Sequence, residues 1–340
     1  MADSPSVRDL FARPLRDLRV SVTDRCNFRC RYCMPREVFG PGFEFMRTVD
    51  LLTIDEIVEV VEAAARLGVQ KVRLTGGEPL LRRDITLLVG RLRRIGSLDL
   101  AMTTNGVGLT RHAAALAEAG LSRLTVSLDS LDDERFRLMS DTRAGVADVL
   151  DGIAAAERAG FTSLKINAVI RADHPDSDIL DLADYFRGTG HVLRFIEYMD
   201  VGSTNGWRAD QVKNADHIAG LIGRHHPLRS LEPNYPGEVA RRYQYRDGAG
   251  EIGIISSVSK PFCTDCTRAR LAADGKLYTC LFATEGTDLR ALLRGTRAPG
   301  DLERALGGRW RRRDDEYSQT RQDETLPTSS RRIEMSYIGG

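Results

Sequence analysis

The sequence predicts an α/β fold, a partial (β/α)6 barrel of the TIM type followed by a C-terminal extension. Short apolar runs alternate six times with amphipathic helical patterns between residue 17 and about residue 200, which is typical of a parallel sheet covered by helices. The runs are continuous, as expected for strands buried on both faces. A doubly wound open sheet fits these two observations as well. Polar clusters directly after the strands favour the barrel, because barrel enzymes build their sites from several strand ends.

Six strands and six helices are predicted in this part of the chain. The strands are expected at residues 18–22, 72–75, 98–103, 124–128, 164–170 and 192–196. The helices are expected at residues 54–67, 85–95, 112–119, 134–139, 146–159 and 179–186. The first helix is the clearest, because Thr53 and Glu56 form a capping box and Gly68 follows its last turn. The polar clusters after the strands lie at residues 23–25, 76–78, 104–105, 129–130 and 197–199.

Changes in composition divide the chain into three parts. We expect the barrel at residues 1–230 and a region richer in proline, glycine and arginine at residues 231–306. Residues 307–340 are charged and poor in apolar side chains, which predicts a mobile tail ending in Gly339-Gly340. No function is assigned to residues 139–146 or to the arginine run at residues 311–313, and a solvated face is expected for both.

Charge and hydropathy exclude several classes of partner. The 49 basic and 48 acidic residues leave a net charge of +1, which gives no support for nucleic-acid or membrane-surface binding. No apolar run of about 18 residues is present, so no transmembrane helix is predicted. Residues 1–13 show no secretory signal, and a cytoplasmic location is expected.

The cysteines form two groups of three that lie far apart in the sequence. They are Cys26, Cys30 and Cys33, and Cys263, Cys266 and Cys280. Disulfides are disfavoured in a reducing compartment, and an odd number in each group leaves one thiol without a local partner. The pattern therefore favours metal ligation.

The first group has the spacing C-x3-C-x2-C and follows the first strand directly. Three thiolates on one short loop are able to hold three irons of a [4Fe–4S] cube, and the fourth iron is then open to a small molecule. A zinc loop or a simple electron-transfer cluster is the alternative. Both normally need a fourth cysteine or histidine close by, and no histidine occurs before His112.

The second group also offers three thiolates, and it predicts a second cube with an open iron. His217, His225 or His226 could instead complete a zinc site. Arg268 and Arg270 follow Cys266 and would share one face of an extended segment, where they suit bidentate contacts to phosphate oxygens. A solvated surface pair is the alternative for these arginines. We expect this C-terminal iron–sulfur extension to close the mouth of the barrel.

The first cysteine motif, with Tyr32 before its last cysteine, resembles the signature of the radical S-adenosylmethionine enzymes. Gly76-Gly77-Glu78-Pro79 resembles the second motif of that family. Across nearly the whole chain, the sequence resembles the GTP 3′,8-cyclases within this group. The resemblance lies in residues 18–26, 72–79, 103–106, 126–129, 165–167, 194–197 and 263–270, and in the terminal Gly339-Gly340.

The resemblance implies two [4Fe–4S] clusters and S-adenosylmethionine as cofactors. The first cluster would be held by Cys26, Cys30 and Cys33 and would cleave S-adenosylmethionine to a 5′-deoxyadenosyl radical. The second would be held by Cys263, Cys266 and Cys280 and would bind the guanine. The residues that match the family's cofactor contacts are Tyr32, Gly77, Ser127 and Met199.

The resemblance also implies the reaction and its substrate. The radical would remove the ribose 3′ hydrogen of GTP, and the carbon radical would attack C8 of the guanine, as the first step of molybdenum cofactor biosynthesis. The matching GTP contacts are Arg19, Arg73, Thr103, Lys165, Arg268, Ala269 and Arg270, with the register between Thr103 and Thr104 open. Arg19, Lys165, Gly339 and Gly340 would also contribute to catalysis beside the first three cysteines.

Two rival interpretations remain at this point. One is a radical enzyme with two clusters that modifies a peptide, although such enzymes usually carry more C-terminal cysteines. The other is a regulatory protein that binds iron–sulfur clusters or zinc and has no enzymatic activity. For the cyclase, the expected partners are an electron donor protein and a downstream cyclic pyranopterin monophosphate synthase. The chain would act as a monomer or a homodimer.

Overall fold

The computed structural model describes residues 6–321 and 332–339. They form a single mixed sheet of twelve strands in the order β12-β11-β10-β1-β2-β3-β4-β5-β6-β9-β8-β7. The six strands predicted from the sequence are β1 (Asp17–Ser21), β2 (Lys71–Thr75), β3 (Asp99–Thr104), β4 (Arg123–Ser127), β5 (Lys165–Ile170) and β6 (Val192–Glu197). All six are parallel in sequence order, which confirms the predicted α/β class.

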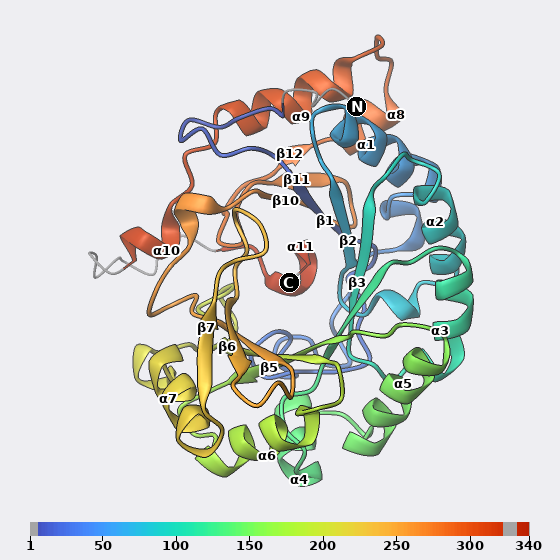
Figure 1. The fold of residues 1–340 in the computed structure, drawn as a ribbon. Helices are drawn as coiled ribbons and strands as arrows, with labels where there is room; N and C mark the ends of the chain where they lie inside the picture. Colours follow the sequence, from blue (N-terminus) through green and yellow to red (C-terminus); the bar gives the residue numbers. More distant parts are fainter. Residues whose placement is uncertain (1–5, 322–331, 340) are drawn as a thin grey trace.

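The later part of the chain extends this sheet at both edges. The added strands are β7 (Leu228–Leu231), β8 (Arg241–Tyr245), β9 (Glu251–Ile255), β10 (Arg268–Leu271), β11 (Lys276–Tyr278) and β12 (Thr287–Asp288). β9 pairs in parallel with β6, and β10 pairs in parallel with β1, whereas the four outer strands are antiparallel. The sheet curves into an arc that does not close, which agrees with the predicted partial barrel (Figure 1).

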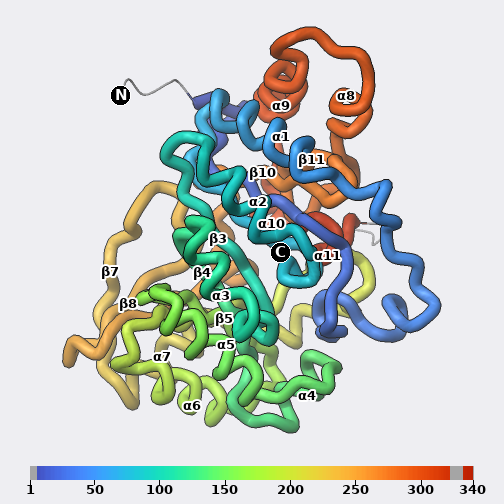
Figure 2. Tube along the Cα trace, turned by 90° about the vertical axis from the view of Figure 1, so that its right-hand side faces the viewer, coloured from blue at the N-terminus to red at the C-terminus, as the bar shows by residue number. Residues whose placement is uncertain are grey.

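Helices cover the outer face of the arc, as Figures 1 and 2 show. The helices that follow the first strands are α1 (Ile54–Arg66), α2 (Ile85–Leu92), α3 (Leu109–Glu118), α4 (Asp133–Ser140), α5 (Val146–Arg158) and α6 (Asp176–Phe186). The later ones are α7 (Ala215–His225), α8 (Arg290–Arg294), α9 (Asp301–Arg311), α10 (Tyr317–Thr320) and α11 (Met335–Ile338). Four single 3-10 turns complete the described elements: η1 (Thr48–Asp50), η2 (Pro79–Leu81), η3 (Ala209–Gln211) and η4 (Cys263–Asp265).

Local sequence signals explain how the first helix begins and ends. The Thr53 hydroxyl accepts from the Glu56 N–H over 3.2 Å, and the Glu56 carboxylate accepts from the Thr53 N–H over 2.7 Å. This reciprocal pair is the capping box that the sequence predicts. Gly68 has a φ of +105°, which a residue without a side chain adopts at little cost after the last turn.

Within the described residues, part of the charged C-terminal segment differs from its prediction as a mobile, solvated tail. α9 packs against α1, and the side chains of Trp310 and Arg313 are buried. Arg311 and Arg312 are exposed as expected, so only the third arginine of the run departs from the solvated face. α11 lies inside the arc of strands, where Ile338 packs against Ala272 and Tyr278 (Figure 1). Composition alone does not predict this burial, because a few buried side chains anchor an otherwise polar segment.

None of the helices in the described residues is long and apolar enough to cross a membrane.

Glu197, at the end of β6, ties three segments of the fold together. Its fully buried carboxylate accepts from the backbone N–H groups of Ala215, Val258 and Ser259 at 2.7–2.8 Å, and from the Ser259 hydroxyl. These bonds join β6 to the start of α7 and to the segment that leads toward the second cysteine group. Glu197 therefore braces the fold at a strand end where the sequence pattern predicted a site residue.

We expect Glu197→Gln to lower the free energy of unfolding by about 2 kcal/mol, because the new amide group would face backbone donors in a buried position. Chemical denaturation of the purified protein measures this. The matched control is Glu134→Gln, on the exposed face of α4. Equal midpoints for the two variants would contradict the bracing role.

Candidate active site

Both cysteine groups line one cavity inside the arc of strands. The cavity has a volume of about 590 Å³ and receives side chains from both ends of the strands and from the 262–282 segment. All six cysteines line it, and all six are free thiols. Segments that are more than 220 residues apart in the sequence thus meet around one space.

The first cysteine loop is held by hydrogen bonds within the loop and to the end of α4. The Cys33 N–H donates to the Cys30 carbonyl over 2.9 Å, and the Cys26 sulfur accepts from the Phe28 N–H over 3.4 Å. The Arg29 and Arg31 N–H groups donate to the carbonyls of Ser140 and Met139, at 2.9 and 3.0 Å. The 139–146 stretch, expected as a solvated face, therefore begins with two residues that hold this loop.

Burial, together with nearby acids, keeps the first-group thiols protonated in the free protein. Burial, followed by Glu78, raises the pKa of Cys26 to about 12. Burial and the neighbouring Cys26 raise the pKa of Cys30 well above its usual value. A bound metal centre would have to displace these protons, since thiolates are the form that ligates iron.

The donor set fits an iron–sulfur cube better than a single metal ion. In the described part of the chain, no three His, Cys, Asp or Glu side chains are arranged to hold one ion. The histidines proposed as zinc ligands lie on or just after α7, where His217 pairs with Asp176 and His226 with Asp184. His225 is exposed, and no histidine is among the residues that line the cavity.

The residues matched to S-adenosylmethionine contacts line the same cavity as the first cysteine group. Tyr32, Gly77, Ser127 and Met199 all line the cavity. The Tyr32 hydroxyl donates to Asp129 over 2.8 Å, and Asp129 also accepts from the Val169 N–H over 2.8 Å. Asp129 thus fixes the orientation of the tyrosine ring beside the cysteine loop.

The Gly76-Gly77 turn packs against the loop that enters the first cysteine group. A Cβ atom at Gly77 would lie 2.2 Å from the Arg25 carbonyl oxygen, and Gly76 has a φ of +144°. Only glycine permits this approach. The buried Glu78 carboxylate accepts from the N–H groups of Leu80 and Asn105 and from the Thr104 hydroxyl, at 2.7–3.0 Å. Burial nevertheless raises the pKa of Glu78 to about 7.

Cationic side chains line the same cavity as the cysteines. Six of the residues matched to GTP contacts line it: Arg19, Arg73, Thr103, Lys165, Arg268 and Arg270. Ala269 does not line it, because its side chain packs into the apolar core on the other face of β10. Thr103 accepts a hydrogen bond from Arg73 over 3.0 Å, whereas the Thr104 hydroxyl is directed to Glu78.

Five further cations that line the cavity were missed by the sequence reasoning, and three of them lie in strands. Lys71 and Arg123 begin β2 and β4, and Arg194 lies within β6. Lys71 pairs with Asp17 over 3.1 Å, and Arg194 donates to the Asn167 side chain over 2.9 Å. The signal that could have found them is a charged residue within or just before a predicted buried strand, where a charge is costly without a partner.

The positive charge in the cavity is incompletely balanced by the protein itself. The Arg19 Nε is buried without a hydrogen-bond partner. Burial and then Arg270 and Arg268 lower the Arg19 pKa well below its usual value. Burial and then Arg194 lower the pKa of Lys165 to about 7. Crowded, desolvated cations of this kind suit a ligand that carries several negative charges.

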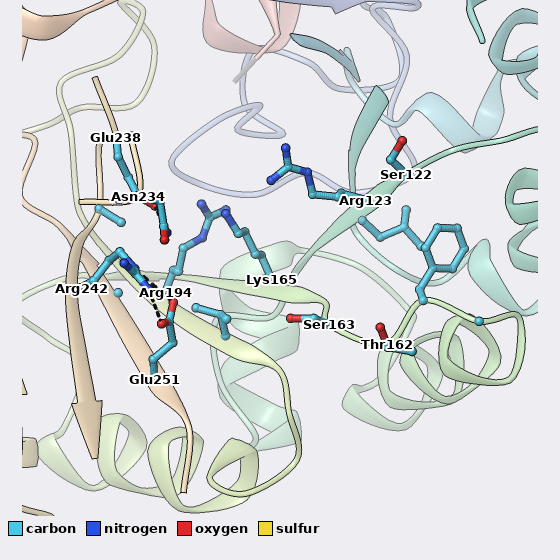
Figure 3. A pocket seen from close by; sticks show the side chains of 16 residues that line it. Ser122, Arg123, Thr162, Ser163, Lys165, Arg194, Asn234, Glu238, Arg242 and Glu251 are labelled. Atoms are coloured by element: carbon cyan, nitrogen blue, oxygen red, sulfur yellow. Dashed lines mark hydrogen bonds and ion pairs between the residues drawn. The ribbon is translucent and has the colours of Figure 1, made fainter. Parts of the chain in front are cut away.

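A smaller pocket of about 360 Å³ adjoins these cations at the base of the strands. Arg123, Lys165 and Arg194 extend toward it, and Asn234, Glu238 and the Arg242–Glu251 pair form its other side (Figure 3). Residues 235–237 line the main cavity, so the segment after β7 lies between the two spaces.

The C-terminal tail reaches the active-site cavity. Arg270 donates to the Gly339 carbonyl, and a Cβ atom at Gly339 would lie 2.3 Å from the Thr75 methyl group. Glu334 accepts from the Ser203 N–H and from the hydroxyls of Ser203 and Thr204, each over 2.9 Å. These contacts place Gly339 beside a predicted substrate ligand. Gly340, also predicted to be catalytic, lies outside the described residues.

Comparisons with known proteins agree with these features. Residues 20–186 match the radical SAM superfamily, and residues 191–319 match the molybdenum cofactor synthesis C family. The chain is 50% identical to a GTP 3′,8-cyclase of Acidothermus cellulolyticus, with coverage of 98% of this chain and 99% of that protein. It is 43% identical to a GTP 3′,8-cyclase of Staphylococcus aureus, with the same coverage.

Solved structures show the same fold at low sequence identity. SuiB of Streptococcus suis, in its crystal structure bound to S-adenosylmethionine, superposes with a TM-score of 0.60 at 15% identity. The superposition covers 91% of this chain and 68% of SuiB. The fold, the two cysteine groups and the full-length similarity lead to one conclusion: the chain belongs to the GTP 3′,8-cyclase family of radical S-adenosylmethionine enzymes.

Proposed function

We propose that this protein converts GTP to (8S)-3′,8-cyclo-7,8-dihydroguanosine 5′-triphosphate, the first step of molybdenum cofactor biosynthesis. One observation carries the proposal. Two groups of three cysteines line the same cavity as a cluster of cations whose charge the protein's own acids balance only in part. A nucleoside triphosphate matches this arrangement, because it joins a base that can ligate iron to a chain of negative charges.

The six cysteines would hold two [4Fe–4S] clusters, three thiolates to each. The cluster held by Cys26, Cys30 and Cys33 would supply the electron for cleavage of S-adenosylmethionine, and the one held by Cys263, Cys266 and Cys280 would offer an open iron to the guanine. Tyr32, Gly77, Ser127 and Met199 would hold S-adenosylmethionine beside Cys26, Cys30 and Cys33. The Asp129–Tyr32 bond fixes one wall of that subsite before the cofactor arrives.

The cations would orient the triphosphate by charge and by hydrogen bonds. Arg19, Arg73, Lys165, Arg268 and Arg270 are candidates from the family resemblance, and Lys71 and Arg194 join them in the cavity. Arg73 is held by the hydroxyls of Thr103 and Thr125, each over 3.0 Å, so its guanidinium has little freedom to lose on binding. Rigid placement matters here because a carbon radical must meet only its target.

The remaining assignments are proposals that rest on the family. An electron donor protein would reduce the enzyme, and a cyclic pyranopterin monophosphate synthase would consume its product. A cytoplasmic location is supported by six free thiols, and the chain would act as a monomer or a homodimer. The division at residues 230 and 306 is also kept as a proposal.

The direct test is an anaerobic turnover assay with reconstituted protein, S-adenosylmethionine, a reductant and GTP. We expect 5′-deoxyadenosine to form with GTP and to fall to background without it, with the cyclised nucleotide identified by mass spectrometry. The same assay with ATP in place of GTP is the control for general nucleotide binding. Release of 5′-deoxyadenosine that requires a peptide and ignores GTP would support the peptide-modifying alternative instead.

Binding of GTP should take up a proton above neutral pH. The pKa of Lys165 is about 7 in the free protein, and a bound triphosphate would raise it by favouring the charged amine. Affinity should therefore fall as the pH rises from 7 to 9. Calorimetry at pH 8, in buffers of different ionisation enthalpy, should give an uptake approaching one proton. Lys165→Arg should abolish this uptake, and an unchanged uptake would contradict the assignment.

Gly339→Ala should weaken the docking of the tail by about tenfold, because a left-handed φ costs a non-glycine residue about 1–2 kcal/mol and the methyl group would meet Thr75. The rate of cyclised product formation measures the effect, with iron content unchanged. Gly223→Ala, where a Cβ atom meets nothing within 4 Å, is the matched control. Equal rates of product formation in the two variants would show that activity does not require Gly339 to be docked in the cavity.

A further inference from the structure

Two buried arginines hold the backbone of all three cysteines in the second group. Arg13 Nη1 donates to the Cys263 carbonyl over 2.6 Å. Arg313 Nη1 donates to the Cys266 carbonyl over 2.8 Å, and its Nε donates over 3.1 Å to the carbonyl of Thr279, the residue before Cys280. Each cysteine is therefore fixed at its own or its preceding peptide group.

The two arginines share one carboxylate. Asp9 Oδ2 lies 2.6 Å from Arg13 Nε and 3.1 Å from Arg313 Nη1. The side chains are 2% exposed for each arginine and 0% exposed for Asp9. Asp9 Oδ1 accepts from the N–H groups of Arg13 and Phe11, at 2.8 and 3.0 Å. We refer to Asp9, Arg13 and Arg313 as the arginine clamp.

The clamp joins the N-terminal hairpin and the segment after α9 to the second cysteine segment. The N-terminal hairpin carries Asp9 and Arg13, and Arg313 follows the end of α9. The Trp310 indole donates to the Arg13 carbonyl over 3.1 Å, and the Arg313 guanidinium lies 4.6 Å from the centre of the Trp310 ring. Segments 300 residues apart are thus packed together beside the cysteines.

Charge distinguishes the clamp from an ordinary structural contact. A buried ion network is expensive to desolvate, and apolar packing often stabilises a fold as well or better. Arg13 and Arg313 each place a guanidinium group within hydrogen-bond distance of the cysteine segment, and Asp315 pairs with Arg313 Nε over 3.2 Å. One nitrogen of Arg13, Nη2, is buried without a partner. The clamp therefore brings guanidinium charge to the segment whose thiolates would carry negative charge.

We propose that the arginine clamp positions the second cysteine group for its iron–sulfur cluster and offsets the charge of its thiolates. Asp9, Arg13 and Arg313 are then positioning residues that act through the cysteine backbone. This inference rests on the proposed function, since it presumes that a cluster is bound there. Hydrogen bonds and charges around the ligands of a metal site are known to set both its occupancy and its potential.

The test compares Arg313→Met and Arg313→Lys with the parent protein after anaerobic reconstitution. We expect Arg313→Met to lower bound iron from about eight toward about four per chain, or to shift the second cluster to a more negative potential. Electron paramagnetic resonance during a redox titration follows each cluster. The first cluster, identified in a Cys263→Ala, Cys266→Ala, Cys280→Ala variant, should not change. Arg313→Lys should restore part of the effect because it keeps the charge.

Arg66→Met is the matched control. Arg66 pairs over 2.6 Å with Glu303 of α9, the helix that precedes Arg313, and it is not among the residues that line the cavity. Any of three results would overturn the proposal. They are unchanged iron content and potentials in Arg313→Met, equal potential shifts of both clusters, and the same effect in Arg66→Met. Parent protein with only about four irons would contradict the two-cluster function itself. About eight irons in the parent with no response to Arg313→Met would overturn the clamp alone.

Discussion

The arrangement of the site depends on buried positive charge that the protein leaves under-compensated. The strands that form the cavity would be more stable with apolar side chains facing inward, since a desolvated cation without a partner is costly. Asp17 pairs with Lys71 and Asp99 with Arg123, whereas three further acids of the cavity are engaged with other groups. Glu78 and Glu197 accept backbone hydrogen bonds, and Asp129 is bonded to Tyr32 and Val169. The cavity therefore gains stability when a polyanion enters it.

The topology brings this charge and the cysteines together. Parallel strands end at the same edge of a sheet, so the loop after β1 and the turn after β2 meet around the first cysteine group. β10 then pairs with β1 in parallel, with Arg270 opposite Arg19 in the register. That pairing brings Cys263 and Cys266, which precede β10, to the same cavity as the first cysteine group. Backbone pairing thus sets the relation between two sites that are far apart in the sequence.

Much of the fold could be predicted from local sequence patterns. The capping box at Thr53 and the terminating Gly68 defined α1, and continuous apolar runs marked the six central strands. β10 escaped prediction because it is short and alternates arginine with buried alanine and leucine. β9 is as long as β1, but it lies beyond the six strand–helix repeats that guided the prediction. The arginines of β10 were read as ligand contacts, and their spacing on one face was correct.

The site was predictable where a motif or a family pattern carries it, and less so elsewhere. The cysteines, the Gly-Gly turn and the family's cationic positions were all named from the sequence. Lys71, Arg123 and Arg194 were not, because only the curvature of the sheet shows which strand residues face inward. Ala269 was included by motif position although its side chain faces the core. Arg313 looked like one of three solvated arginines, and only the tertiary packing of α9 reveals its burial.

The central claim is that each cysteine group leaves one iron open, the first to S-adenosylmethionine and the second to GTP. Electron paramagnetic resonance of the reduced protein tests it most directly, with two variants that each retain only one cysteine group. We expect S-adenosylmethionine to change the spectrum only when Cys26, Cys30 and Cys33 remain, and GTP to change it only when Cys263, Cys266 and Cys280 remain. Spectra that respond to neither molecule would contradict the account.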